Sequence, residues 1–202
     1  YKNNMIALGN GITTGYPISG IYEMGGTDNF YFNSVYIGGS DVVSANLANT
    51  YAFYSTVTVN TRNFLNNIFV NARSNASGTG KNYGIRVGGS SANPSGLTSN
   101  YNLINVTGVG GVFGYFNLLD VADLAAWRTA TGQDANSLSA DPLFADPTNA
   151  TPNLHLTMGS PAEGVGLNIP SVTDDFDGHL RADFTPEDIG ADAGNYDNIS
   201  PT

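Results

Sequence analysis

The 202-residue chain contains no cysteine, which excludes a disulfide-stabilised scaffold and metal sites built on thiolates. Charged residues make up only 12% of the chain, compared with about 25% in an ordinary soluble domain. Glycine, asparagine, serine and threonine take their place. Because a surface of amides and hydroxyls suits a protein outside the cell, we expect an extracellular or cell-surface location.

Basic residues are also scarce, with 7 Lys and Arg against 17 Asp and Glu, for a net charge of −10. The imbalance is concentrated in residues 120–202, whose net charge is −12, whereas residues 1–119 sum to +2. No basic patch is available to neutralise phosphates, so nucleic acid is not an expected partner. The acidic second half is compatible with divalent cations.

Long apolar runs are absent. No stretch of about 18 apolar residues occurs, so the sequence predicts no membrane span. The chain opens at Tyr1 within sequence that looks ordered, and residues 198–202 resemble the start of a linker. We therefore expect a piece of a longer protein, with further domains of the same parent chain as partners.

The first half of the chain contains an internal repeat. A short apolar strand recurs, centred in turn on Ile21, Phe53, Ile85 and Val112, at steps of 32, 32 and 27 residues. A second kind of strand follows each time, in residues 29–37, 63–70 and 100–106, and repeats every 33 to 35 residues. Turn-forming segments rich in glycine, serine and asparagine separate these strands. The fixed period indicates a repeat architecture.

No helical pattern precedes residue 118, although parallel strands are normally joined by crossover helices. A coil in which each strand stacks on its counterpart one turn later is the other way to pair them, so the pattern predicts an all-β solenoid. An antiparallel β-sandwich is the competing fold, and the fixed step favours the solenoid.

An asparagine recurs just before the second apolar strand of each repeat. The candidates are Asn33, Asn66 or Asn67, and Asn102. Asparagines at one corner of successive coils can stack into a ladder in which each amide bonds to the coils above and below. The alternative is that these asparagines only reflect the preference of this residue for turns.

From residue 118 the pattern changes. Residues 118–130 have helical spacing, with Asp120 as the expected N-cap and Gly132 as the residue after the helix. Trp127 lies in this helix. A string of motifs follows it: TGQD (131–134), DPLF (141–144), NLHL (153–156), SPAEGVG (160–166), DFDGHLR (175–181) and DIGA (188–191).

This string resembles the C-terminal end of bacterial parallel β-helix proteins of the pectate-lyase-like superfamily. The upstream segments FNSVYIGG (32–39) and LNNIFVNA (65–72) resemble repeats of large secreted surface proteins of Bacteroidetes-type bacteria. The resemblance implies a right-handed parallel β-helix with a short helix and an irregular C-terminal cap. It also implies a tight turn at Asp177 and Gly178, and an Arg181 that pairs with a carboxylate. The expected division is β-helix turns in 1–117, C-terminal turns and cap in 118–197, and a linker from 198.

Catalytic candidates are few. Enzymes of this superfamily that eliminate or hydrolyse uronic-acid polymers need cations or paired carboxylates. Arg73, Lys81 and Arg86 are the candidate cations, and the only acids of the repeat region, Glu23, Asp28 and Asp41, belong to one turn. Neither set forms a convincing catalytic pattern.

Two binding sites are predicted besides. Asp174, Asp175 and Asp177 lie within four residues next to a glycine, which partly resembles a Ca²⁺ loop, with a solvated turn as the alternative. Tyrosines recur at strand positions, and we take four as ligand-binding candidates: Tyr22, Tyr36, Tyr54 and Tyr83. Exposed tyrosine rows bind sugar rings, whereas inward-facing ones only pack.

The sequence therefore favours a non-catalytic module for adhesion or polysaccharide binding. The alternatives are a polysaccharide lyase or glycoside hydrolase, and a structural repeat of a surface filament.

Overall fold

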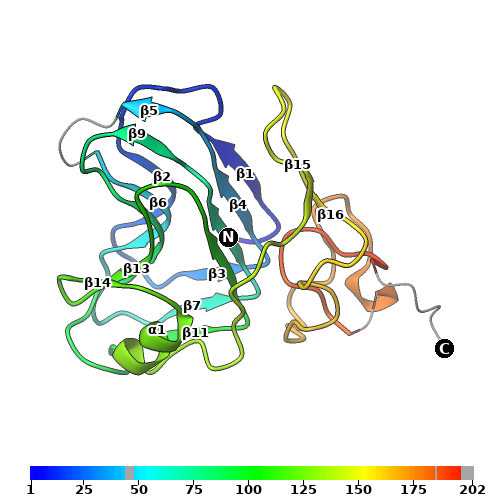
Figure 1. The fold of residues 1–202 in the computed structure, drawn as a ribbon. Coiled ribbons are helices and arrows are strands. Elements are labelled where there is room, and N and C mark those ends of the chain that lie inside the picture. Colours follow the sequence, from blue (N-terminus) through cyan, green and yellow to red (C-terminus); the bar gives the residue numbers. More distant parts are fainter. Residues whose placement is uncertain (44–47, 185, 197–202) are drawn as a thin grey trace.

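A computed structural model describes residues 1–43, 48–184 and 186–196. The predicted linker, residues 198–202, lies outside the described residues. The chain forms a parallel β-solenoid of about three turns, with one short α-helix. Figure 1 shows the stacked coils beside a C-terminal segment that follows a different path. The predicted solenoid is therefore confirmed.

Three parallel sheets form the walls of the solenoid. The first contains β1 (Met5–Leu8), β4 (Ser34–Ile37), β8 (Ile68–Asn71) and β12 (Leu103–Val106). The second contains β2 (Ile18–Glu23), β6 (Thr50–Ser55), β10 (Asn82–Arg86) and β13 (Gly111–Phe116), extended by the antiparallel β14 (Leu119–Val121). The third contains β3 (Asn29–Tyr31), β7 (Arg62–Leu65) and β11 (Leu97–Asn100). A minor pair joins β5 (Val42–Val43) to β9 (Asn75–Ser77).

The register of the second sheet follows the sequence period, with one correction. Ile21 pairs with Phe53 and Phe53 with Ile85, as the steps of 32 residues predict. The residue opposite Ile85 is Gly114, and Val112 lies two residues earlier, opposite Tyr83. A Cβ on Gly114 would lie 2.6 Å from the Trp127 ring. The apolar pattern is thus interrupted because the tryptophan fills the space of a side chain.

The asparagine ladder is confirmed, with Asn67 as its second member. Asn33 Nδ2 donates to Asn67 Oδ1 (2.9 Å), and Asn67 Nδ2 donates to Asn102 Oδ1 (3.0 Å). Asn4, which the repeat did not reveal, extends the ladder by donating to Asn33 Oδ1 (2.7 Å). The same oxygens accept the backbone N–H of the ladder residue in the preceding coil, so the ladder satisfies buried backbone groups at the corner.

The residue before each ladder asparagine has a left-handed backbone: φ is 55° at Asn3, 54° at Phe32, 59° at Asn66 and 55° at Tyr101. This conformation turns the chain sharply between the third and first sheets. It is uncommon for residues other than glycine, and asparagine adopts it more readily than most. Asn66, the alternative ladder candidate, therefore forms the corner itself.

The helix α1 (Leu124–Thr131) begins later than predicted. Its N-cap is Asp123, whose side chain accepts from the Ala126 N–H (2.8 Å), and not Asp120. Asp120 lies in β14, where its carboxylate binds Lys81 and Tyr83. The helix ends as predicted at Gly132, which has a left-handed φ of 66°.

The helix α1 covers the last coil. Trp127 is buried and its ring packs near Phe113 and Phe116. Its Nε1 donates to Asp134 Oδ2 (2.8 Å), while Asp134 Oδ1 accepts from Asn102 Nδ2 (3.1 Å). The capping helix and the asparagine ladder therefore meet at one buried carboxylate.

Residues 139–184 and 186–196, here called the C-terminal segment, lie along the side of the solenoid and not across its end (Figure 1, yellow to red). Its elements are an antiparallel hairpin of β15 (Phe144–Asp146) and β16 (Asn153–Leu156) and a 3₁₀ turn, η1 (Arg181–Asp183). Leu154, Leu156 and Ile189 pack with Tyr36 and Ile68 of the first sheet. This segment caps a sheet face, and only α1 and the residues next to it cap the end.

The left-handed corners anchor the C-terminal segment. Asn66 makes two hydrogen bonds to the backbone of Leu167, at 2.7 and 2.9 Å. The Arg181 guanidinium lies over the Phe32 ring (3.9 Å) and donates to Asn3 Oδ1 (3.1 Å). The residues at these left-handed corners thus precede the ladder asparagines, which lie inside the solenoid, and they also bind the C-terminal segment on its outside.

No helix in the described part of the chain has the length and apolarity needed to cross a membrane.

Candidate functional site

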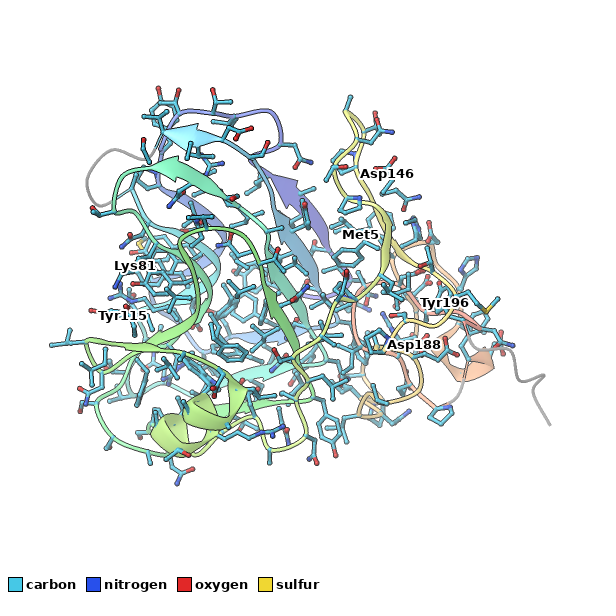
Figure 2. All side chains as sticks on the ribbon, viewed as in Figure 1. Met5, Lys81, Tyr115, Asp146, Asp188 and Tyr196 are labelled. Carbon is cyan, nitrogen blue, oxygen red and sulfur yellow. The ribbon has the colours of Figure 1, made fainter. Side chains whose placement is uncertain are left out.

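Tyrosines and one arginine gather on the outer side of the second sheet, which we call the aromatic face. The strand register aligns four side chains in one row across β2, β6, β10 and β13: Tyr22, Tyr54, Arg86 and Tyr115. Tyr51 and Tyr83 form a second row beside them. In Figure 2, Tyr115 and Lys81 lie on the side of the solenoid away from Asp188 and Tyr196 of the C-terminal segment. The face is therefore free of that segment.

The rings of this face are in contact along the solenoid axis. Tyr22 stacks on Tyr54 with ring centroids 4.6 Å apart, and Tyr51 stacks on Tyr83 at 5.0 Å. Tyr51 and Tyr54 join the two rows at 4.6 Å. Tyr22 is 50% exposed, so one edge of the stack is open to solvent.

Arg86 completes the row. Its guanidinium lies 4.4 Å from the centre of the Tyr54 ring and 4.8 Å from that of Tyr115, an arrangement in which the rings stabilise the cation. Within residues 1–43, 48–184 and 186–196 this guanidinium has no hydrogen bond and no carboxylate partner. The planar N–H donors of Arg86 thus remain available for an anion such as a carboxylate.

A groove of about 570 Å³ opens beside Arg86. Its lining combines Arg86 and Tyr115 with hydroxyl and amide side chains, among them Ser55, Thr56, Ser90 and Asn117. Aromatic faces next to hydroxyls, amides and one free cation are the groups that bind sugar rings bearing acidic substituents.

The four predicted tyrosines occupy different environments. Tyr22 and Tyr54 lie in the row described above, whereas Tyr83 is only 2% exposed and its hydroxyl donates to Asp120 Oδ1 (2.9 Å). Burial, together with this hydrogen bond, raises the pKa of Tyr83. Tyr36 belongs to the first sheet and is buried under the C-terminal segment. Tyr115 is the member of the row that sequence reasoning missed, because the predicted step placed Val112, and not Gly114, opposite Ile85.

The three candidate cations do not converge. Arg73 is buried at the corner near β9, where it donates to the carbonyl oxygens of Gly38 (3.1 Å) and Thr14 (2.9 Å), and burial lowers its pKa. Lys81 forms a salt bridge with Asp120. Only Arg86 faces the groove unpaired.

Of the candidate acids of the repeat region, Glu23 and Asp28 line a second groove next to Tyr22, and Asp41 is not among its lining residues. Glu23 is buried, accepts a hydrogen bond from Ser55, and has a pKa raised by burial. Asp28 is half-buried and Asp41 is exposed at a distant corner. The free cation therefore has no pair of carboxylates arranged around it in the groove lining.

The structure brings two of the three predicted Ca²⁺ residues together: Asp175 and Asp177 each offer a carboxylate oxygen within 4.8 Å of the other and of His179, and Asp174 is not in this group. Asp174 binds Lys2 (2.8 Å). Asp175 is buried and accepts the backbone N–H groups of Asp177 (2.9 Å) and His179 (2.8 Å), which fixes the tight turn at Gly178. Asp177 contacts His155, in a different part of the sequence.

Arg181 donates to backbone carbonyls, contrary to the carboxylate pairing that the resemblance implied. Its guanidinium reaches the oxygens of Asp174 (3.1 Å), Gly190 (3.0 Å) and Ala191 (3.1 Å). It forms no salt bridge with a described carboxylate. Burial lowers its pKa although several acids surround it.

No model of a protein family, no curated protein and no solved structure matches this chain. The β-solenoid is established by the structure alone. The more specific resemblance, to the pectate-lyase-like superfamily and to bacterial surface proteins, stays a prediction.

Proposed function

We propose that this chain is a non-catalytic β-solenoid module of a secreted bacterial surface protein and that it binds acidic polysaccharide along its aromatic face. The observation that carries the proposal is the unpaired Arg86 guanidinium, held between the rings of Tyr54 and Tyr115 next to the groove. The low content of charged residues and the resemblance to bacterial exoproteins support the proposed location.

The geometry supports sugar binding in two ways. The row from Tyr22 to Tyr115 offers ring edges, and at its end the half-exposed Tyr22, against which the apolar side of a sugar can pack. Arg86 then offers a planar pair of donors to a uronate carboxylate, which is the bidentate pairing for which arginine is suited. Parallel strands repeat at about 4.8 Å, so the row presents a regular, elongated surface to an elongated polymer.

The positions of the three candidate cations favour binding without catalysis. Elimination would need a base close to the group that neutralises the carboxylate, yet Arg73 is buried at another corner and Lys81 is paired with Asp120. Inverting hydrolysis would need two carboxylates about 6.5–9.5 Å apart, and none of the carboxylates of the repeat region lines the groove. These placements support the binding module over the lyase or hydrolase.

The test is a panel of acidic and neutral polysaccharides, scored for binding by calorimetry and for unsaturated ends by ultraviolet absorbance. We expect polygalacturonate or alginate to bind, and neutral glucans to bind at least ten times more weakly. Arg86→Met should abolish most of this preference because it keeps the side-chain stem and removes the donors. Lys81→Met is the matched control, since it removes a cation of the same face that is already paired.

Equal binding of neutral and acidic polymers, unchanged in Arg86→Met, would contradict the proposed site. The appearance of unsaturated ends would show a lyase and overturn the non-catalytic reading.

A further inference from the structure

We propose a binding site for a divalent transition-metal ion, such as Zn²⁺, formed by His155, Asp177 and Asp192 in the C-terminal segment. Each of these residues offers one ligand atom, and the three atoms lie within 4.8 Å of one another. They come from β16, from the turn at Gly178 and from the segment after Gly190, so the folded segment brings them together. This site shares only Asp177 with the Ca²⁺ loop expected from the sequence.

The orientation of His155 is the observation that points to a cation. The backbone N–H of His155 donates to Asn153 Oδ1 (3.0 Å), which identifies that atom as the amide oxygen. The same oxygen contacts ring atom Nδ1, so Nδ1 carries a hydrogen. Nε2 faces Asp177 Oδ2 at 2.7 Å, which is the distance of a hydrogen bond. A metal ion that takes the place of the hydrogen between these two atoms would bind both of them, and bonds of about 2.0 Å in a tetrahedral site require the atoms to separate to roughly 3.3 Å.

The surroundings hold these ligands as metal sites require. A metal-binding histidine commonly donates its other ring N–H to an oxygen, which Asn153 supplies. Asp192 is buried and accepts hydrogen bonds from the backbone N–H of Leu156 (2.8 Å) and from the Tyr196 hydroxyl, so its carboxylate is fixed. His155 and Asp177 have side chains 37% and 35% exposed, which leaves a path for an ion from solvent.

The donor set indicates the class of metal. Imidazole nitrogen favours Zn²⁺, Cu²⁺, Ni²⁺ and Fe²⁺, whereas Ca²⁺ prefers a cage of oxygens alone. One histidine and two carboxylates make three protein ligands, which leaves a fourth tetrahedral position for water or another donor. The net charge of −12 in residues 120–202 adds a general attraction for cations.

A second trio, Asp175, Asp177 and His179, shares Asp177 and provides the competing site. Its carboxylate from Asp175 already accepts three backbone N–H groups, from Asp177, His179 and Ala193. Asp192 accepts two hydrogen bonds, from the Leu156 N–H and the Tyr196 hydroxyl, and so keeps more lone pairs for a metal than Asp175 does, which makes the trio with His155 the better site.

Calorimetric titration of the chelator-treated protein with Zn²⁺, Co²⁺ and Ca²⁺ tests the proposal. We expect one Zn²⁺ per chain, a visible absorption band with Co²⁺, and a higher melting temperature with Zn²⁺. His155→Gln and Asp177→Asn, both partly exposed, should weaken Zn²⁺ binding at least tenfold, while their melting temperatures in chelator show that they fold. His179→Gln is the matched control and should bind as the wild type does.

Failure to bind Zn²⁺ at millimolar concentration would mean that a proton alone occupies the gap and would overturn the proposal. Zn²⁺ binding that survives His155→Gln but not His179→Gln would assign the metal to the second trio and overturn it equally. Tighter binding of Ca²⁺ than of Zn²⁺ would contradict the class of metal.

Discussion

The solenoid and the C-terminal segment satisfy their buried polar groups in different ways. At the corner of the solenoid, a column of neutral amides from Asn33, Asn67 and Asn102 bonds each coil to the next. In the C-terminal segment, ionisable carboxylates accept hydrogen bonds from the buried backbone: Asp188 accepts the backbone N–H groups of Gly164 (2.8 Å) and Gly194 (2.9 Å). The periodic region thus uses amides and the irregular region uses acids.

The difference follows from the path of the backbone. In a solenoid most N–H and C=O groups find partners in the neighbouring coil, and a stacked asparagine supplies both a donor and an acceptor at the corner. An irregular chain leaves isolated N–H groups inside, and a carboxylate can accept several of them. This explains a part of the uneven charge of the sequence, because Asp175, Asp188 and Asp192 are buried acceptors and not surface charges.

The largest expected effect is the loss of a central ladder residue. Asn67→Ala removes the acceptor of the Asn33 N–H and the donors to Phe30 O (2.9 Å) and Asn102 Oδ1 in a fully buried place. Several buried hydrogen bonds at about 1–3 kcal/mol each predict a fall of roughly 4 kcal/mol in the free energy of unfolding. Denaturant titration measures it.

The control is Asn63→Ala, which breaks the exposed side-chain pair of Asn63 and Asn29 (2.7 Å) on the neighbouring sheet. It should lower the free energy of unfolding by less than about 1 kcal/mol. If the two variants lost the same stability, the ladder would not be a special support of the solenoid.

The next effect concerns the acids of the C-terminal segment. Burial raises the pKa of Asp188 to about 7, against the partial compensation of its backbone hydrogen bonds. Between about pH 4 and 7 the unfolded chain therefore loses this proton while the folded chain keeps it, so the free energy of unfolding falls as the pH rises. The fall attributable to Asp188 is roughly 2–4 kcal/mol, at about 1.4 kcal/mol per pH unit.

Asp188→Asn stays neutral at every pH and should flatten this part of the pH profile, measured by denaturant titration from pH 4 to 8. Asp183→Asn changes an exposed carboxylate of the same segment and should leave the profile unchanged. If the free energy of unfolding of Asp188→Asn fell as steeply with pH as that of the wild type, other groups and not Asp188 would cause the pH dependence.

How far the sequence predicts the structure also differs between the two regions. The 32-residue step predicted the pairing of Ile21, Phe53 and Ile85, and the recurring asparagine predicted the ladder. Both succeeded because a repeat fixes which residues stack. The period gave no sign that Trp127 would replace a side chain at Gly114.

The repeat period could not predict how the irregular region packs or which cations are buried. The docking of the C-terminal segment on the first sheet depends on single contacts, such as those of Asn66 and Arg181, that no period marks. Arg73 looked like a free cation in sequence, yet it is buried among carbonyls. The candidate metal site brings together His155 and Asp192, which only the fold makes neighbours; the alternation of Leu154, His155 and Leu156 was its single sequence signal.

The smallest expected effect tests whether the two regions unfold separately. Asn66→Gly keeps a residue that tolerates a positive φ but removes both hydrogen bonds to the Leu167 backbone. We expect a loss of roughly 1–2 kcal/mol, confined to the C-terminal segment because the ladder residue Asn67 is untouched. Hydrogen exchange should therefore accelerate at the Leu167 amide and its neighbours, while the strands β4, β8 and β12 keep their protection.

The matched control is Asn93→Gly, since Asn93 also has a positive φ of 54° but is exposed and bonds to Gln133 and not to the C-terminal segment. It should change exchange only locally. If Asn66→Gly instead accelerated exchange throughout the first sheet, the C-terminal segment would be part of one cooperative unit with the solenoid. The carboxylates that support the segment would then stabilise the whole fold, and the contrast between amide-supported and acid-supported regions would describe two chemistries within one unfolding transition.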